Sequence, residues 1–192
     1  MTNCIEIKGL VKEYKTFTLG PIDLKVPGGS ILGLIGENGA GKTTLIKSML
    51  GITRPTAGAV KLLGTNPDRA KEDIGIVLDD CFFSEYLRVR DVESVLCRVF
   101  KSWDKGLYRD YLDKFGLSGA KNIKELSRGM RMKLSLAAAL AHRPRLLLLD
   151  EATAGLDPVV REEILDEFLA FVSDEDHAIL ISSHITSDLE KV

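Results

Sequence analysis

The chain has 192 residues, and its 26 basic and 28 acidic side chains leave a formal net charge of −2. This length suits one domain with a full core, and the balanced charge argues against a nucleic-acid-binding or polybasic membrane-binding surface. The three cysteines fit no metal or redox spacing, no apolar signal segment follows Met1, and the apolar stretches are too short to cross a bilayer, so we expect a reduced cytosolic protein.

The first third of the chain is rich in strand patterns. Residues 3–14 and 17–26 alternate between apolar and polar side chains, which predicts two strands of a meander. A turn at Pro27-Gly28-Gly29 separates them from a third, apolar strand at 31–35.

A glycine-rich segment follows the third strand: Gly36-Glu37-Asn38-Gly39-Ala40-Gly41-Lys42-Thr43-Thr44. It matches G-x-x-x-x-G-K-[ST], and residues 45–50 have the pattern of a helix, so the strand, loop and helix that this motif requires are all present. Glycines let several backbone N–H groups face one polyphosphate, and the helix directs its positive end at the same anion. We expect Lys42 to reach the β- and γ-phosphates and the Thr43 hydroxyl to bind Mg²⁺. An ordinary glycine-rich turn is the alternative, and the filled motif with its correct flanks disfavours it.

The middle of the chain changes from strands to helices. We expect a short strand at 59–63, a loop at 64–68 and an apolar strand at 74–78. From about residue 90 to 142 the apolar spacing becomes helical, which predicts a helix with Asp91 as a plausible cap, a second helix at 107–115 closed by Gly116, and a third that includes 134–141. The apolar positions of the first helix are Val92, Val95, Leu96, Val99 and Phe100. These helices form a lobe inserted into an α/β core.

A second group of polar residues follows a fully apolar strand at 146–149. Asp150 and Glu151 come at its carboxyl end, where open α/β sheets bind their ligands. Asp150 is placed to hold Mg²⁺ and Glu151 to activate or orient an attacking water. Two solvated carboxylates at a strand end are the alternative. A helix at 158–172, a strand at 178–182 and a helix from 185 complete the pattern.

Several motifs occur in the order that is found in the ATP-binding cassette family. They are the phosphate loop, Leu126-Ser127-Arg128-Gly129-Met130, the 146–151 segment, Gly155-Leu156-Asp157-Pro158 and Ser182-Ser183-His184. The chain resembles that family from about residue 3 to 192. The resemblance implies an α/β fold: a P-loop NTPase core with a β-rich edge subdomain and an inserted helical subdomain. It implies one domain over 1–192, with a mixed-sheet core at 1–79 and 143–192 and the helical subdomain at about 80–142.

The resemblance also assigns roles to single residues. Tyr14 matches the aromatic residue that stacks on adenine, although Phe17 is a nearby alternative. Ser127 and Gly129 would meet the γ-phosphate held by a partner chain, and Asp157 would link the two sites. His184 would bind the γ-phosphate and act in catalysis with Lys42 and Glu151. His142 and His177 match nothing in the family, and we expect them at the surface or in packing.

The implied function is that of an ATP-binding and ATP-hydrolysing subunit of a transporter. It would bind Mg²⁺ and ATP and dimerise with itself or a homologous ATP-binding chain. It would drive a separate transmembrane permease from the cytoplasmic side of the cell membrane, without binding nucleic acid. The contact with the permease would lie at about residues 82–92. A soluble ATPase that acts on ribosomes or DNA, and a nucleotide-gated module without turnover, are the two alternatives.

The chain departs from the family pattern at three places. Asp79 occupies a position that is usually Gln, and we expect it to add a carboxylate to the Mg²⁺ site. Arg128 replaces a common Gly of the signature. The sequence also ends soon after His184, so we expect the family's C-terminal portion to be missing.

Overall fold

We describe residues 3–79 and 81–183 of a computed structural model of the chain, in which the strands form two sheets. The first sheet is antiparallel and has the order β2-β1-β4. It consists of β1 (Asn3–Glu13), β2 (Thr18–Pro27) and β4 (Ala57–Leu62). β1 and β2 confirm the two strands that were predicted at 3–14 and 17–26. β1 is the central strand, because β2 pairs with one of its edges and β4 with the other.

The second sheet is parallel and carries the candidate site at its carboxyl edge. Its order is β3-β7-β6-β5, with β3 at Ser30–Ile35, β5 at Ile74–Val77, β6 at Leu146–Asp150 and β7 at Ala178–Ser183. All residues of β6 and β7 are buried, which explains why these strands are nearly continuous apolar runs. The expected mixed-sheet core is thus wrong in detail, because the parallel and antiparallel strands separate into two sheets.

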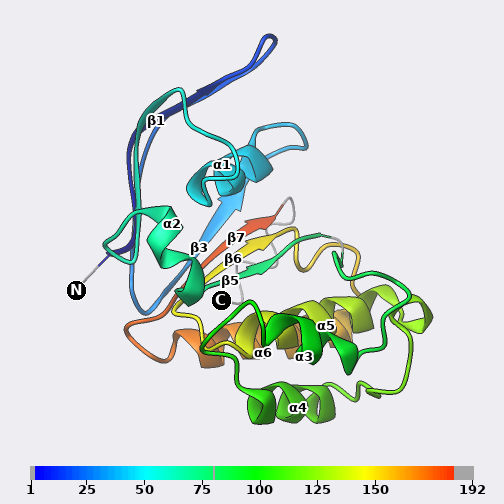
Figure 1. Ribbon diagram of the computed structural model, residues 1–192. Coiled ribbons are helices and arrows are strands. Elements are labelled where there is room, and N and C mark those ends of the chain that lie inside the picture. The colour runs from blue at the N-terminus through cyan, green and yellow to red at the C-terminus, as the bar shows by residue number, and fades with distance from the viewer. Residues whose placement is uncertain (1–2, 80, 184–192) are drawn as a thin grey trace.

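The parallel sheet separates two apolar cores. Leu146 and Leu148 pack with the antiparallel sheet and α1 (Lys42–Met49), whereas Leu147 and Leu149 pack with the helices on the other face. These helices include α5 (Arg128–Leu140) and α6 (Pro158–Val172), which lie together on that side of the sheet in Figure 1. The alternating direction of neighbouring side chains in a strand produces this division. Side chains of β6 therefore contribute to both cores.

The region between β5 and β6 is helical, as the spacing predicts. It contains α3 (Asp91–Leu96), α4 (Lys105–Lys114) and a short 3₁₀ turn, η2 (Ile123–Glu125), before α5. Figure 1 shows α3, α4 and α5 gathered on the side of the parallel sheet that faces away from the β1–β2 hairpin. No helix in the part of the chain that the structure describes is long and apolar enough to cross a membrane.

Three local expectations are wrong. Asp91 is the first residue of α3 and not its cap, and its carboxylate accepts a hydrogen bond from the backbone N–H of Arg88. The helix ends at Leu96, so Val99 and Phe100 lie beyond it. The expected loop at 64–68 instead leads into α2 (Pro67–Ala70) and η1 (Lys71–Asp73), because the Asn66 side chain accepts from the Asp68 N–H and caps the helix.

Candidate functional site

The glycine-rich loop connects the end of β3 to the start of α1. Gly39 and Gly41 have φ values of 86° and 100°, which glycine adopts without steric cost. A Cβ atom at Gly41 would also lie 2.9 Å from the Phe17 ring and 2.9 Å from the Leu19 side chain. No side chain caps α1, so the N–H groups of its first turn remain for an anion at the helix N-terminus.

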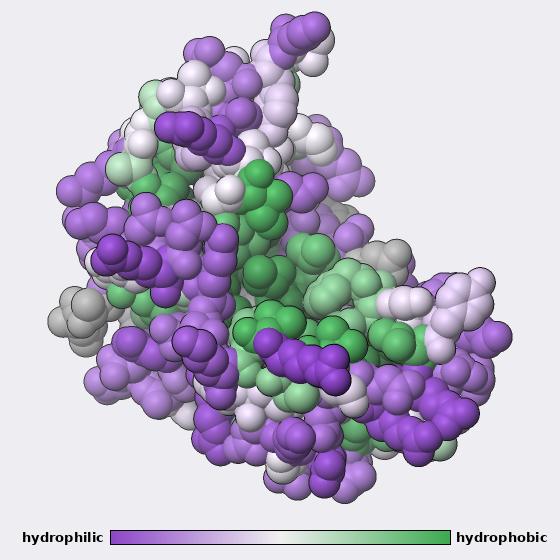
Figure 2. All heavy atoms as spheres, viewed as in Figure 1, coloured by the Kyte–Doolittle hydropathy of each residue, from purple (hydrophilic) through white to green (hydrophobic). Residues whose placement is uncertain are grey.

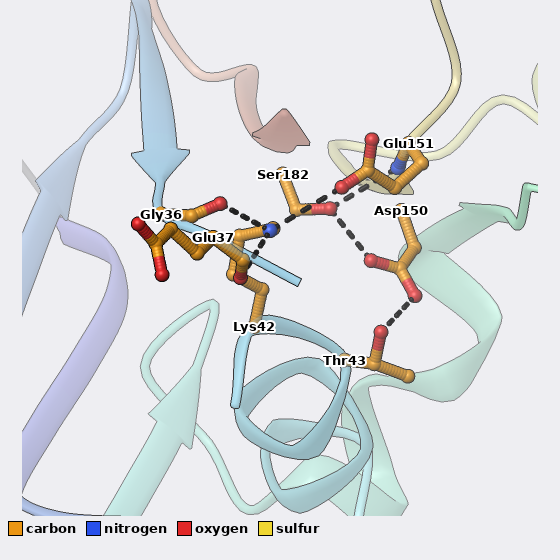
Figure 3. A network of polar contacts seen from close by, with 7 residues as sticks. All are labelled: Gly36, Glu37, Lys42, Thr43, Asp150, Glu151 and Ser182. Carbon is orange, nitrogen blue, oxygen red and sulfur yellow. Dashed lines mark hydrogen bonds and ion pairs between the residues drawn. The ribbon is translucent and has the colours of Figure 1, made fainter. Parts of the chain in front are cut away.

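Lys42 lies across this loop and points toward the end of β6 (Figure 3). Its ammonium donates to the carbonyl oxygens of Gly36 at 2.6 Å and Glu37 at 3.2 Å. The same nitrogen lies 3.4 Å from Oε1 of Glu151, and the Lys42 side chain is 10% exposed. The Lys42 ammonium therefore lies between the glycine-rich loop and the carboxyl end of β6.

A chain of hydrogen bonds joins α1 to the ends of β6 and β7. The Thr43 hydroxyl donates to Oδ2 of Asp150 at 2.7 Å, and the Ser182 hydroxyl donates to Oδ1 of Asp150 at 2.6 Å. The Glu151 N–H donates to the Ser182 hydroxyl at 3.1 Å (Figure 3). Both oxygens of the buried Asp150 carboxylate are thus fixed in place.

Thr43 and Asp150 offer two adjacent hard oxygen ligands, which fit Mg²⁺. Across residues 3–79 and 81–183, no group of three or more His, Cys, Asp or Glu side chains is gathered to hold a metal. Mg²⁺ is often bound by one or two carboxylates plus substrate phosphates, so the Asp150 carboxylate and the Thr43 hydroxyl are the groups that would hold it.

A cavity of about 320 Å³ opens above the loop. Glu151, whose φ of 54° turns the chain sharply after β6, contributes its side chain to the wall together with Asp79. The lining residues are Phe17, Glu37, Asn38, Gly39, Gly41, Lys42, Thr43, Thr44, Asp79 and Glu151. The structure therefore brings together the predicted phosphate loop, the predicted base and Asp79, the carboxylate that was predicted to add to the metal site.

Tyr14, Ser127, Gly129 and Asp157 are not among the residues that line this cavity. Tyr14 is 46% exposed, and its ring lies 5.2 Å from the Lys12 ammonium. Ser127 caps α5 through the N–H of Met130, and Asp157 caps α6 through the N–H of Val160.

The starts of α5 and α6 are neighbours, because a Cβ at Gly129 would lie 3.2 Å from Val160. His184 lies outside the described residues.

Ser182 joins the candidate site through its hydrogen bonds with Asp150 and Glu151. Its place in the Ser182-Ser183-His184 motif did not predict this role. The feature that could have revealed this position is the register of the parallel sheet, which sets Asp150 of β6 opposite Ser182 of β7. A hydroxyl at the carboxyl end of a strand next to Asp150 is well placed to orient that carboxylate.

The fold and this arrangement define a P-loop nucleotide-binding domain, since a glycine-rich loop with Lys and Thr faces two carboxylates at the sheet's carboxyl edge. The family model described as ABC transporter matches residues 19–154. The chain therefore belongs to the ABC transporter family.

Known proteins of the same family align with nearly the whole chain. The chain is 38% identical over 203 residues to the bacitracin transport ATP-binding protein BcrA of Enterococcus faecalis, covering 100% of this chain and 65% of that protein. It is 33% identical over 190 residues to the lantibiotic transport ATP-binding protein SrtF of Streptococcus pyogenes, covering 97% and 82%.

A solved structure of an ATP binding subunit of an ABC transporter matches with a TM-score of 0.86 and 25% identity, over 98% of this chain and 82% of that one. The 65% coverage given above means that the chain spans about two thirds of the length of the bacitracin transport protein.

Proposed function

We propose that this chain is the ATP-binding and ATP-hydrolysing subunit of an ABC transporter. One observation carries the proposal: Lys42 and Thr43, from the start of α1, contact Glu151 and Asp150, from the end of β6. Lys42, Thr43 and Glu151 line one cavity, and Thr43 contacts Asp150. This supports a site in which Lys42 would bind phosphate, Thr43 and Asp150 would hold Mg²⁺, and Glu151 would act as the base.

Each residue of the proposed site has one task. Backbone N–H groups of residues 36–44 and the Lys42 ammonium bind the phosphates, and Thr43 and Asp150 hold Mg²⁺. Bound Mg²⁺ neutralises charge that develops on the phosphates during transfer. The Glu151 carboxylate accepts a hydrogen bond from the attacking water and orients it toward the γ-phosphate. Asp79, at the wall of the same cavity, adds negative charge near the metal.

The proposed active form is a dimer around two nucleotides, formed with a second copy or with a homologous chain. Ser127 and Gly129 of one chain would meet the γ-phosphate bound by the other, and Asp157 would lie between the two sites. The exposed Ser127 and Asp157 cap neighbouring helices, which supports a common role at one interface. His184 completes the proposed site and lies outside the described residues.

The proposed partner is a separate membrane-embedded permease, and it would hold this chain at the cytoplasmic face of the membrane. Apolar side chains gather in a hollow over β5 and α3 (Figure 2), at a cavity of about 250 Å³ whose lining includes Phe82, Leu96 and Val99. Phe82 and the neighbouring Tyr86 are exposed. An exposed apolar surface of this kind is typical of a protein–protein contact and supports docking near residues 82–92.

The domain division is also a proposal. We divide the single domain into a core at 1–79 and 143–192 and a helical subdomain at about 80–142, which agrees with the grouping of α3, α4 and α5.

The transported substrate is a proposal as well. The relatives named for bacitracin and lantibiotic transport make peptide antibiotics the first substrates to test.

Co-purification tests this function against its alternatives. The tagged protein is isolated from detergent-solubilised membranes, and a permease and ATP hydrolysis are measured in the same sample. We expect a Phe82→Ser/Tyr86→Ser variant to lose the permease, while Ile52→Ser, at an exposed apolar residue elsewhere, keeps it. Hydrolysis with no membrane protein would indicate an uncoupled soluble ATPase, and a permease without hydrolysis would indicate a nucleotide-gated module.

A further inference from the structure

The hydroxyl of Ser182 contacts both acidic residues at the end of β6. Its oxygen lies 2.6 Å from Oδ1 of Asp150 and 3.1 Å from the backbone nitrogen of Glu151 (Figure 3). A backbone N–H can only donate a hydrogen bond, and an ionised carboxylate can only accept one. The hydroxyl therefore has one arrangement: it accepts from Glu151 and directs its own proton at Asp150.

The parallel sheet fixes the position of this hydroxyl. Ser182 lies in β7, which pairs with β3 on one side and with β6 on the other, and it is in register with Asp150. Ser182 and Asp150 are buried, with exposed fractions of 0% and 4%, so little solvent competes for the hydrogen bond between them. The contact between the hydroxyl and Oδ1 is thus a fixed part of the site.

The two oxygens of the Asp150 carboxylate have different partners. Oδ1 accepts from Ser182, whereas Oδ2 accepts from the Thr43 hydroxyl at 2.7 Å. Thr43 and Asp150 are the residues proposed to hold Mg²⁺. A cation bound beside Thr43 would therefore meet Oδ2, because Oδ1 is held by Ser182.

Mg²⁺ and Ca²⁺ place different demands on a carboxylate. Mg²⁺ requires nearly octahedral ligands at about 2.0–2.1 Å, whereas Ca²⁺ takes six to eight oxygens at about 2.3–2.6 Å and accepts both oxygens of one carboxylate. A carboxylate that offers a single fixed oxygen suits Mg²⁺. A carboxylate that can turn both oxygens to the cation suits Ca²⁺ better.

We propose that Ser182 determines the metal specificity of the site: by holding Oδ1, it leaves Asp150 one oxygen for the cation and so favours Mg²⁺ over Ca²⁺. This inference rests on the proposed function, since it assumes that Thr43 and Asp150 hold the metal of a bound nucleotide. Ser182 acts through Asp150. Its loss should therefore change the choice of metal more than the binding of metal-free nucleotide.

The test is the affinity for ATP in three conditions: saturating Mg²⁺, saturating Ca²⁺, and EDTA, which removes both cations. Calorimetry measures it for the wild type, Ser182→Ala, Ser182→Thr and Ser48→Ala. We expect the wild type to prefer Mg·ATP, and Ser182→Ala to lose about tenfold of that preference, the low end of the range for residues that orient a metal ligand. Its affinity in EDTA should be unchanged, and Ser182→Thr, which keeps the hydroxyl, should keep the preference.

Ser48→Ala is the matched control, because it removes another buried serine hydroxyl. That hydroxyl has no hydrogen-bond partner in the part of the chain that the structure describes. The control should bind ATP like the wild type in all three conditions. The Glu151 N–H also lies 3.2 Å from the Ser182 carbonyl oxygen, so it keeps a partner in Ser182→Ala, and we expect that variant to fold.

Several results would overturn the inference. One is a wild type that binds Mg·ATP and Ca·ATP equally, and another is a Ser182→Ala variant that keeps the wild-type preference. Equal weakening of ATP binding by Ser182→Ala in all three conditions would show that Ser182 only supports the fold. Loss of the preference in a folded Ser182→Thr variant would show that the hydroxyl is not its cause. A wild type that binds ATP in none of the conditions would instead overturn the proposed function itself.

Discussion

The ammonium of Lys42 lies 3.4 Å from Oε1 of Glu151, which links the phosphate loop to the proposed base. Both side chains are largely buried, with exposed fractions of 10% and 18%, so little solvent screens the pair. Phosphates that bind the loop would compete for Lys42, and Glu151 would then be released toward a water molecule. We infer that nucleotide binding and the freeing of the base are coupled through this contact.

The Lys42→Ala change tests the phosphate-binding role. We expect ATP affinity to fall by roughly tenfold to a hundredfold, because hydrogen bonds to charged groups contribute about 1.5–3 kcal/mol and each 1.4 kcal/mol is about tenfold. Calorimetry on the folded variant measures the change. Lys47→Ala, at an exposed lysine of the same helix, is the control and should bind ATP like the wild type. Equal affinities for the two variants would refute the role of Lys42.

The Asp79→Gln change tests whether the unusual carboxylate contributes to the metal site. Asp79 lines the same cavity as Thr43 and Glu151. Removing its charge should raise the Mg²⁺ concentration needed for half-maximal activity while maximal activity stays within about tenfold, since one charge pair near a surface contributes a few kcal/mol at most. A magnesium titration shows this. An unchanged or lower Mg²⁺ requirement would mean that Asp79 only stabilises its loop.

His142 should make stability depend on pH. Its ring is buried, stacks on Phe100 at 4.0 Å, and has Nε2 3.1 Å from the Ile74 carbonyl oxygen. Burial lowers its pKa below the usual 6.5, against the opposing influence of that carbonyl and of Glu72 and Asp73. The unfolded chain therefore binds this proton more readily, and stability should fall as the pH drops below about 6.5.

Thermal unfolding between pH 7.5 and 5.5 measures this effect. A His142→Gln variant lacks the titrating group, so its melting temperature should depend less steeply on pH over this range. Parallel curves for the two proteins would show that His142 does not contribute to the pH dependence.

Much of the framework could be predicted because its signals are local. The apolar spacing and the Asp157-Pro158 start predict 158–172 as a helix, and α6 is Pro158–Val172. The strand, loop and helix around Lys42 follow from a motif whose fixed positions have direct physical roles. By contrast, the start of α2 depends on one Asn66 hydrogen bond, and short helices have weak sequence signals.

The rest depends on contacts between residues far apart in the sequence. Nothing near His142 indicates that its ring is buried against Phe100. Ser182 acquires its place beside Asp150 only through the register of β6 and β7. The contact between Phe17 and Gly41 joins two segments that the sequence pattern treats separately. Local spacing therefore predicts elements well and their pairing poorly.

The release of inorganic phosphate from Mg·ATP by the wild type and by Glu151→Gln tests whether this site hydrolyses ATP. Glutamine keeps the shape of the side chain and removes the base, so we expect unchanged ATP binding, at least a ~10²-fold loss of turnover, and accumulation of the ATP-bound dimer. Glu175→Gln, at an exposed turn, should keep the wild-type rate. Equal phosphate release by Glu151→Gln and the wild type would contradict the assignment of this site as the centre of ATP hydrolysis.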